Sequence, residues 1–334
     1  MTHSSSANDL APKPYEMVSF PKDSPRLARP VGHDRYQRNR LHGTLYLTLQ
    51  VQTALHVSTG ITEMGSDLGS RLPLIKTMTT TDRQLVIQGS SLKGCIRSAY
   101  EAVTNSTLAV ITSRYRDKIP SDRLPCRDRE KLCPASRIFG AMDWQGLVEF
   151  SDSKCEKNEL SVGFMPSLYS PRSECRTYFI GSRVAGRKFY YNMTSVINKG
   201  ENRGIPAQQA SRQYKFKTVI QYKNLLPEEL GIVLLLLGQD PKFPMALKIG
   251  GGKPIGMGTM TTVVTAIAHS QDVRSRYREY EVPNAQIIGS EMRTFIEKQM
   301  DAAYQSDLLE KVQWQQLATI LKYPATHEPP EGMY

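Results

Sequence analysis

The stretch GSSLKGCIR places two serines before two spaced cations: Ser90, Ser91, Lys93 and Arg97. The apolar residues that follow recur with helical spacing, so the serines fall on the first turn of a predicted helix. A helix N-terminus presents unpaired backbone N–H groups and a partial positive charge, which together bind anions. The stretch therefore predicts a phosphate contact. The alternative is that Ser90 only caps the helix while Arg97 pairs with Glu101 one turn on.

A second candidate contact is the stretch KIGGGKPIGMG, in which two lysines flank consecutive glycines: Lys248, Gly250, Gly251, Gly252 and Lys253. Backbone without Cβ atoms lets a bulky ligand approach the main chain, and the lysines favour an anionic ligand. The spacing is not that of a Walker loop, and the stretch leads into a predicted strand rather than a helix. Taken alone, it is also compatible with a flexible turn.

Basic and aromatic residues are interleaved in a long segment, at about residues 164–217. This mixture suits nucleic acid, because cations contact phosphates and aromatic rings stack on bases. Three cations of the segment are candidate RNA contacts: Arg183, Arg187 and Lys188. The alternative is a solvated loop whose aromatic side chains form a small core of their own.

The net charge supports a polyanionic partner. The 334 residues include 43 Lys and Arg against 32 Asp and Glu, a formal charge of +11, and nucleic acid is the simplest partner of that kind. The N-terminal residues lack the charged start and apolar run of a signal peptide. The longest apolar run, IVLLLL, is far shorter than the roughly 20 residues of a membrane span. We therefore expect a cytoplasmic protein without a membrane partner.

The sequence contains an odd number of cysteines, spread thinly along the chain: Cys95, Cys126, Cys133, Cys155 and Cys175. This usage indicates reduced thiols rather than a disulfide framework. Cys126 and Cys133, with six residues between them, are candidate ligands of a structural zinc, which needs four nitrogen or sulfur ligands. Because the spacing alone is a weak signal for zinc, the alternative of unrelated buried thiols is favoured.

The elements that must position these residues follow from hydrophobic periodicity. Residues 44–57 alternate and predict a half-buried strand, followed by a Gly/Ser-rich loop over 58–73. A helix begins near Ser90, and a second helix begins at Pro227 and ends at Gly238. Further strands are expected at GLVEFSD, ELSVGFM, KFKTVIQYKN and TTVVTAIA. This order predicts an α+β fold, a ferredoxin-like sheet with both helices on one face.

Two segments lie outside this unit. Residues 1–40 are rich in Pro, Ser and charge without a period, and are expected to form an extended arm that wraps something or stays loose. Residues 285–334 contain two amphipathic stretches, which predict a C-terminal helical hairpin packed on the core or on a neighbouring subunit.

The stretches GSSLKGCIR, CPASRIFGA and GGGKPIGMG, in that order, resemble the RAMP superfamily of repeat-associated proteins from CRISPR systems, over roughly residues 41–268. The chain is most similar to the Cas-seven-like backbone subunits of type III effector complexes. The resemblance implies an RRM-like palm, residues 41–284, that binds CRISPR guide RNA. The basic insertion would be a thumb that props guide and target RNA apart. Target RNA and other effector subunits are the further partners implied, in an antiviral ribonucleoprotein.

By the same resemblance, Ser90, Ser91, Lys93 and Arg97 match guide-backbone contacts, and the glycine loop lies beside the RNA. Relatives that cut target RNA carry an Asp two residues before a Pro-aliphatic-aliphatic-basic run. Here that run is PLIK, and the matching residue is Arg71. Asp67 is the nearest acid, so cleavage would use Asp67 with a bound Mg²⁺. His56, beside this loop, is a candidate acid/base or RNA contact, or a structural histidine.

Three functions stay open at this point. The favoured hypothesis is a guide-RNA-binding backbone subunit that need not catalyse anything. The second is a metal-dependent endoribonuclease that cleaves target RNA through Asp67. The third is a stand-alone RRM-like RNA-binding protein. Metal-dependent cutting that is lost in Asp67→Ala distinguishes the second from the first.

Overall fold

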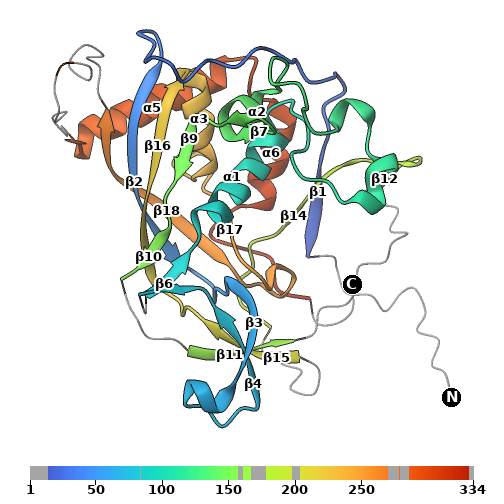
Figure 1. Cartoon of the computed structure of the whole chain (residues 1–334), viewed down its shortest axis with the longest axis vertical. Coiled ribbons are helices and arrows are strands. Elements are labelled where there is room, and N and C mark those ends of the chain that lie inside the picture. Colours follow the sequence, from blue (N-terminus) through green and yellow to red (C-terminus); the bar gives the residue numbers. More distant parts are fainter. Residues whose placement is uncertain are drawn as a thin grey trace.

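The computed structural model describes residues 14–82, 84–156, 161–166, 178–197, 204–269, 278 and 286–330. Its main sheet is built on antiparallel strands in the order β18, β2, β16 and β10 (Figure 1). Their bounds are Thr259–His269, Leu41–Val51, Lys215–Leu225 and Ser153–Cys155. Shorter strands extend or flank this sheet: β5 (Thr80–Thr81), β6 (Gln84–Ile87), β9 (Val148–Phe150), β17 (Leu247–Lys248) and β19 (Gln286–Ile287).

The two central strands form because their side chains alternate. In β2, Leu45, Leu47 and Leu49 are buried while the residues between them are half-exposed. β16 shows the same alternation and pairs with β2 in antiparallel register. The expected strand over 44–57 is shorter at its C-terminal end, because the chain turns after Val51 and the Thr53 hydroxyl donates to the Gly256 carbonyl at 2.8 Å.

Two helices pack against each other on one face of the sheet, as expected for a ferredoxin-like fold: α1 (Gly89–Val103) and α3 (Pro227–Leu236) (Figure 1). The apolar face of α1 is buried, and Pro227 occupies the first turn of α3. α5 (Gly289–Gln305) packs on α3, and α6 (Lys311–Ile320) packs on α1. The C-terminal helices therefore cover the core of their own chain, and α3 is buried on all sides.

A second sheet lies at one end of the main sheet, with the order β11, β15, β4 and β3 (Figure 1). Its strands are Ser161–Pro166, Gly204–Gln209, Leu74–Met78 and Ser58–Met64. The prediction of a loop over residues 58–73 is wrong for residues 58–68, because β3 pairs with β4 as a hairpin and the short helix η1 (Gly65–Leu68) follows β3, whereas residues 69–73 do form a loop. The strand ELSVGFM belongs to this second sheet and not to the ferredoxin-like sheet. We call this second sheet the thumb sheet.

The remaining short elements connect these layers. They are η2 (Ser113–Lys118), η3 (Ser121–Arg123), α2 (Pro134–Phe139), β7 (Gly140–Ala141), β8 (Trp144–Gln145), β12 (Phe179–Ile180), β13 (Arg183–Val184), β14 (Gly186–Tyr190) and η5 (Lys253–Ile255).

The described part of the N-terminal arm wraps its own chain and is not loose. β1 (Tyr15–Ser19) pairs antiparallel with β14 of the basic insertion. Further along, the buried Arg123 side chain donates to the Pro21 and Asp23 carbonyls at 2.8 and 2.6 Å. The arm and the insertion, far apart in sequence, are thus joined into one wall beside α1.

Candidate nucleic-acid interface

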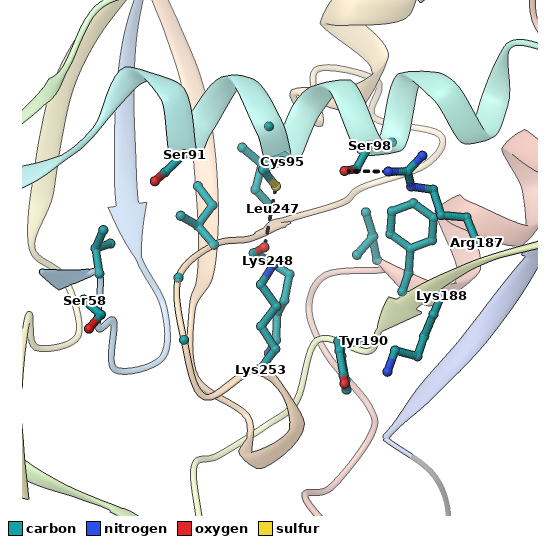
Figure 2. Close-up of a pocket in the computed structure, with 18 residues that line it drawn as sticks. Ser58, Ser91, Cys95, Ser98, Arg187, Lys188, Tyr190, Leu247, Lys248 and Lys253 are labelled. Carbon is teal, nitrogen blue, oxygen red and sulfur yellow. Dashed lines mark hydrogen bonds between the residues drawn. The ribbon is translucent and has the colours of Figure 1, made fainter. Parts of the chain in front are cut away.

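A cleft of about 650 Å³ lies between α1, the glycine loop and β14. We call it the first cleft. It brings together seven of the predicted RNA-binding residues: Ser91, Arg187, Lys188, Lys248, Gly250, Gly251 and Lys253. Figure 2 shows Ser91, Arg187, Lys188, Lys248 and Lys253 on three sides of the cleft, together with residues that were not among the predicted RNA contacts: Ser58, Cys95, Ser98, Tyr190 and Leu247.

The wall formed by α1 carries only small side chains. Ser91, Gly94, Cys95 and Ser98 lie three or four residues apart and therefore share one helix face. The Cys95 thiol donates to the Lys248 carbonyl at 3.5 Å, which joins this wall to the glycine loop (Figure 2). A wall without long side chains leaves room for a polymer backbone to lie against the helix.

The glycine loop is held in place and is not a flexible turn. Gly250 adopts φ 79°, and a Cβ atom there would lie 2.4 Å from the His56 carbonyl oxygen. The same carbonyl accepts a hydrogen bond from the Gly251 N–H at 2.9 Å. The loop is therefore fitted onto the chain at His56, and only glycine allows that approach.

His56 is the residue against which the glycine loop is held. It is 1% exposed, and its Nδ1 lies 2.7 Å from the Gln208 carbonyl oxygen. Burial lowers the pKa of His56 and outweighs that hydrogen bond, so the imidazole is neutral at physiological pH. A buried, neutral ring beneath the loop favours the structural role among the alternatives considered for His56.

Lys248 also supports the loop. Its side chain is buried, and Nζ donates to the Gly256 carbonyl and to the Thr259 hydroxyl, both at 3.1 Å. Burial, with a smaller effect from the charge of Lys253, lowers the pKa of Lys248 to about 7. Lys253 is half-exposed and lines the first cleft, so it is the lysine of this loop whose side chain is accessible there.

The wall formed by β14 presents two restrained cations. Arg187 forms an ion pair with the buried Glu101 and donates to the Ser98 hydroxyl at 3.3 Å. Lys188 Nζ lies over three tyrosine rings at 4.8 to 5.5 Å from their centroids, those of Tyr15, Tyr190 and Tyr178. Both cations are therefore oriented before any ligand arrives.

Lys93 and Arg97 face away from the first cleft. They line a second cleft of about 670 Å³ on the other side of α1, together with Cys126, Arg127 and Trp144. We call this space the second cleft. Within it, burial, followed by the charge of Arg97, lowers the pKa of Lys93. Of the four residues expected at one phosphate site, Ser91 thus lines the first cleft, Lys93 and Arg97 line the second, and Ser90 lines neither.

The start of α1 is also already occupied by an anion of the protein. The Asp152 carboxylate accepts a hydrogen bond from the Gly89 N–H at 2.7 Å, and Ser90 is exposed. The side chain of Ser90 does not cap the helix, because the N-cap position is Gln88. The Arg97–Glu101 pair of the alternative interpretation is present, with Nε and Oε1 2.8 Å apart.

A family model of the RAMP superfamily matches residues 48–261. The chain belongs to the RAMP superfamily. Members of this superfamily have ferredoxin-like folds and are CRISPR-associated RNA-binding proteins, which agrees with the sheet order and with the cationic first cleft. A comparison with curated proteins finds no match. No helix in the described part of the chain is long and apolar enough to cross a membrane.

The other predicted site residues of this RAMP protein lie elsewhere. Asp67 is exposed in η1, at the end of the β3–β4 hairpin, and its carboxylate accepts a hydrogen bond from the neighbouring Ser66 hydroxyl at 3.3 Å. Arg183 is exposed in β13. Within the described ranges, no three His, Cys, Asp or Glu side chains come together as a metal site would require. A single exposed carboxylate does not by itself fit Mg²⁺, so no reaction step follows from it.

The zinc candidates Cys126 and Cys133 do lie close to each other. The Cys133 N–H donates to Cys126 Sγ at 3.3 Å. Cys155 is buried on β10, and Cys175 falls outside the described residues. The geometry thus supplies two of the four ligands that a structural zinc needs.

Two important residues were not predicted from the sequence as parts of the interface. Ser98 lies seven residues after Ser91, and this helical spacing was a usable signal. Tyr15 comes from the arm, where no periodicity pointed to it, and its ring contacts Lys188 of the first cleft only because β1 pairs with β14.

Proposed function

We propose that this RAMP protein is a guide-RNA-binding backbone subunit of a type III CRISPR interference complex. The observation that carries the proposal is the first cleft, where Arg187, Lys188 and Lys253 surround a wall of small side chains and glycines. Cations around an open, smooth wall suit the phosphates of a single strand, which can approach both the helix and the loop.

The contacts proposed are independent of base sequence. The first cleft offers ammonium and guanidinium groups for phosphates, and the half-buried ring of Tyr190 for stacking. A backbone subunit must accept any guide, so this chemistry suits the role. Guide RNA is therefore the proposed ligand of the first cleft.

The proposed roles toward target RNA and neighbouring subunits rest on the thumb sheet. It projects beyond the end of the main sheet, and the hairpin that closes it exposes apolar side chains, among them Ile61, Met64 and Leu74 (Figure 1). In the proposed complex this projection positions target RNA against the guide. Other effector subunits are the further partners.

Lys253→Ala tests the first cleft. We expect weaker binding to single-stranded RNA of any sequence, and a decrease of about 0.7 in the slope of log affinity against log salt, because one phosphate contact is lost. Fluorescence anisotropy with two unrelated RNA sequences over a range of salt concentrations measures both quantities.

The matched control is Lys298→Ala, which removes the same charge from an exposed position on α5. It should leave the slope unchanged. Equal effects of the two variants would mean that the net charge, and not the first cleft, binds RNA. A changed sequence preference in Lys253→Ala would also contradict the proposed phosphate contact.

The type III assignment is tested by coexpression with type III effector subunits and a guide RNA. The proposal expects the chain to elute in one complex with them. Elution of the chain with RNA alone would support the stand-alone RNA-binding alternative.

A further inference from the structure

Cys126 lies in the wall of the second cleft, apart from the proposed guide-RNA site, and forms a pair of thiols with the buried Cys133. Cys133 occupies the N-cap position of α2, and its backbone N–H donates to Cys126 Sγ at 3.3 Å. The Thr107 hydroxyl lies 3.4 Å from Cys126 Sγ and 3.2 Å from Cys133 Sγ. One hydroxyl group is thus shared by both sulfur atoms, which therefore lie side by side.

Ser136 is a further neighbour of the Cys133 sulfur. Its N–H donates to Cys133 Sγ at 3.4 Å, and the Cys133 thiol donates to Ser136 Oγ at 3.3 Å. Two thiols held side by side are the arrangement that thiol–disulfide exchange needs in order to close an intramolecular disulfide.

The two sulfurs differ in access. Cys133 is fully buried, whereas Cys126 is half-buried and lines the second cleft. Three cations line the same cleft: Lys93, Arg97 and Arg127. A reagent must therefore enter through the second cleft and meet Cys126 first, and a negatively charged reagent is attracted there.

We propose that Cys126 and Cys133 form a redox-active dithiol site, which an anionic small-molecule disulfide converts into an intramolecular disulfide. Cys126 loses its proton to solvent, and its thiolate attacks one sulfur of the reagent. The S–S bond of the reagent breaks, one half leaves as a thiolate, and a mixed disulfide remains on Cys126.

The second step closes the protein disulfide. The Cys133 sulfur loses its proton to solvent and attacks Cys126 Sγ, and the other half of the reagent leaves as a thiolate. In total the two cysteines lose two electrons and two protons. The reagent gains the two electrons and becomes two thiols once its thiolates are protonated.

The experiment exposes the full-length protein to oxidised glutathione, alkylates the remaining thiols without reduction and maps tryptic peptides by mass spectrometry. Trypsin cuts at Arg127, Arg129 and Lys131, so it separates Cys126 from Cys133. We expect the peptides 124–127 and 132–137 to appear linked by a disulfide, with Cys95 and Cys155 alkylated. Because the readout is on the unmodified chain, it does not depend on the folding of a variant.

Two variants sharpen the test. Cys126→Ser should abolish the disulfide-linked peptide pair. Cys95 is a half-buried thiol that lines the first cleft, and Cys95→Ser should leave the yield of the linked pair as it is in the unmodified protein. A glutathione adduct that stays on Cys126, a link between any other cysteines, or no modification at all would overturn the proposal. So would zinc bound to the protein as purified and released by Cys126→Ser, because the pair would then be part of a metal site.

Discussion

At the scale of single residues, the cations around the first cleft divide into those that hold the protein together and those available to RNA. Lys248 is buried and donates hydrogen bonds to Gly256 of the glycine loop and to Thr259 at the start of β18. Lys253, five residues later, is half-exposed in the cleft. Two lysines that are equivalent by sequence thus have different roles, because only one of them keeps access to solvent.

Lys248 makes stability depend on pH. Its pKa is about 7 in the folded protein and near 10.5 when exposed, so between these values the unfolded chain binds more protons. The free energy of unfolding therefore rises with pH in this window, by at most about 1.4 kcal/mol per pH unit from this group. We expect Lys248→Met to remove this contribution, as measured by urea unfolding between pH 7 and 8.5.

The comparison must be made as a difference between the variant and the unmodified protein, so that tyrosines and cysteines that titrate in both cancel. Lys298→Met, at an exposed position, is the control and should keep the original slope. If the slope also persists in Lys248→Met, Lys248 stays charged in the folded protein.

At the scale of elements, the thumb sheet is assembled from two distant parts of the chain. β3 and β4 come from the segment before α1, whereas β11 begins just before the basic insertion and β15 lies within it. The parallel pairing of β15 with β4 joins them. Asp67 lies at the end of the β3–β4 hairpin. That hairpin belongs to a different sheet from β17 and β18, the strands on either side of the glycine loop.

We expect Asp67→Ala to leave guide binding and assembly unchanged and to remove at most one cleavage position from a complex in which other subunits still cut. The physical reason is that an exposed carboxylate on a hairpin end positions a metal ion poorly. Target-RNA cleavage by the reconstituted complex with magnesium, mapped at nucleotide resolution, is the measurement.

Glu63→Ala, which removes the other acid of this hairpin, is the comparison variant. Loss of all cutting in Asp67→Ala alone would identify this subunit as the nuclease. Loss of assembly would show that Asp67 is structural.

At the scale of the whole molecule, one buried carboxylate connects three segments. Glu101 of α1 pairs with Arg97 on the same helix and with Arg187 of β14, and accepts a hydrogen bond from the Ala109 N–H at 3.2 Å. The Glu101 side chain is 1% exposed. The α1 wall and the β14 wall of the first cleft are thus joined through one buried carboxylate.

We expect Glu101→Gln to lower the free energy of unfolding by about 3 kcal/mol, because two half-buried guanidinium groups lose their counter-charge. Urea denaturation measures this. Glu149→Gln, the same change at an exposed position, should stay within about 0.5 kcal/mol of the unmodified protein. A small effect at Glu101 would mean that solvent replaces the lost charge.

The sequence by itself determined the elements and their order. Alternation in β2 and β16, the apolar face of α1 and the Pro227 helix start are local patterns, and each predicts its element because burial on one face depends only on neighbouring residues. Ferredoxin-like topology followed from that order, whereas only the family resemblance implied that the glycine loop and the start of α1 both lie beside the RNA.

Only the tertiary structure decided which side chains share a site. Whether Lys93 faces the first or the second cleft depends on what packs on each side of α1, and whether Lys248 is exposed depends on how the glycine loop fits against His56. The joining of β1 to β14, and of β4 to β15, depends on backbone pairing between segments far apart in the chain. Such long-range pairing leaves no periodic signal in either segment, because each strand needs the other to complete its hydrogen bonds.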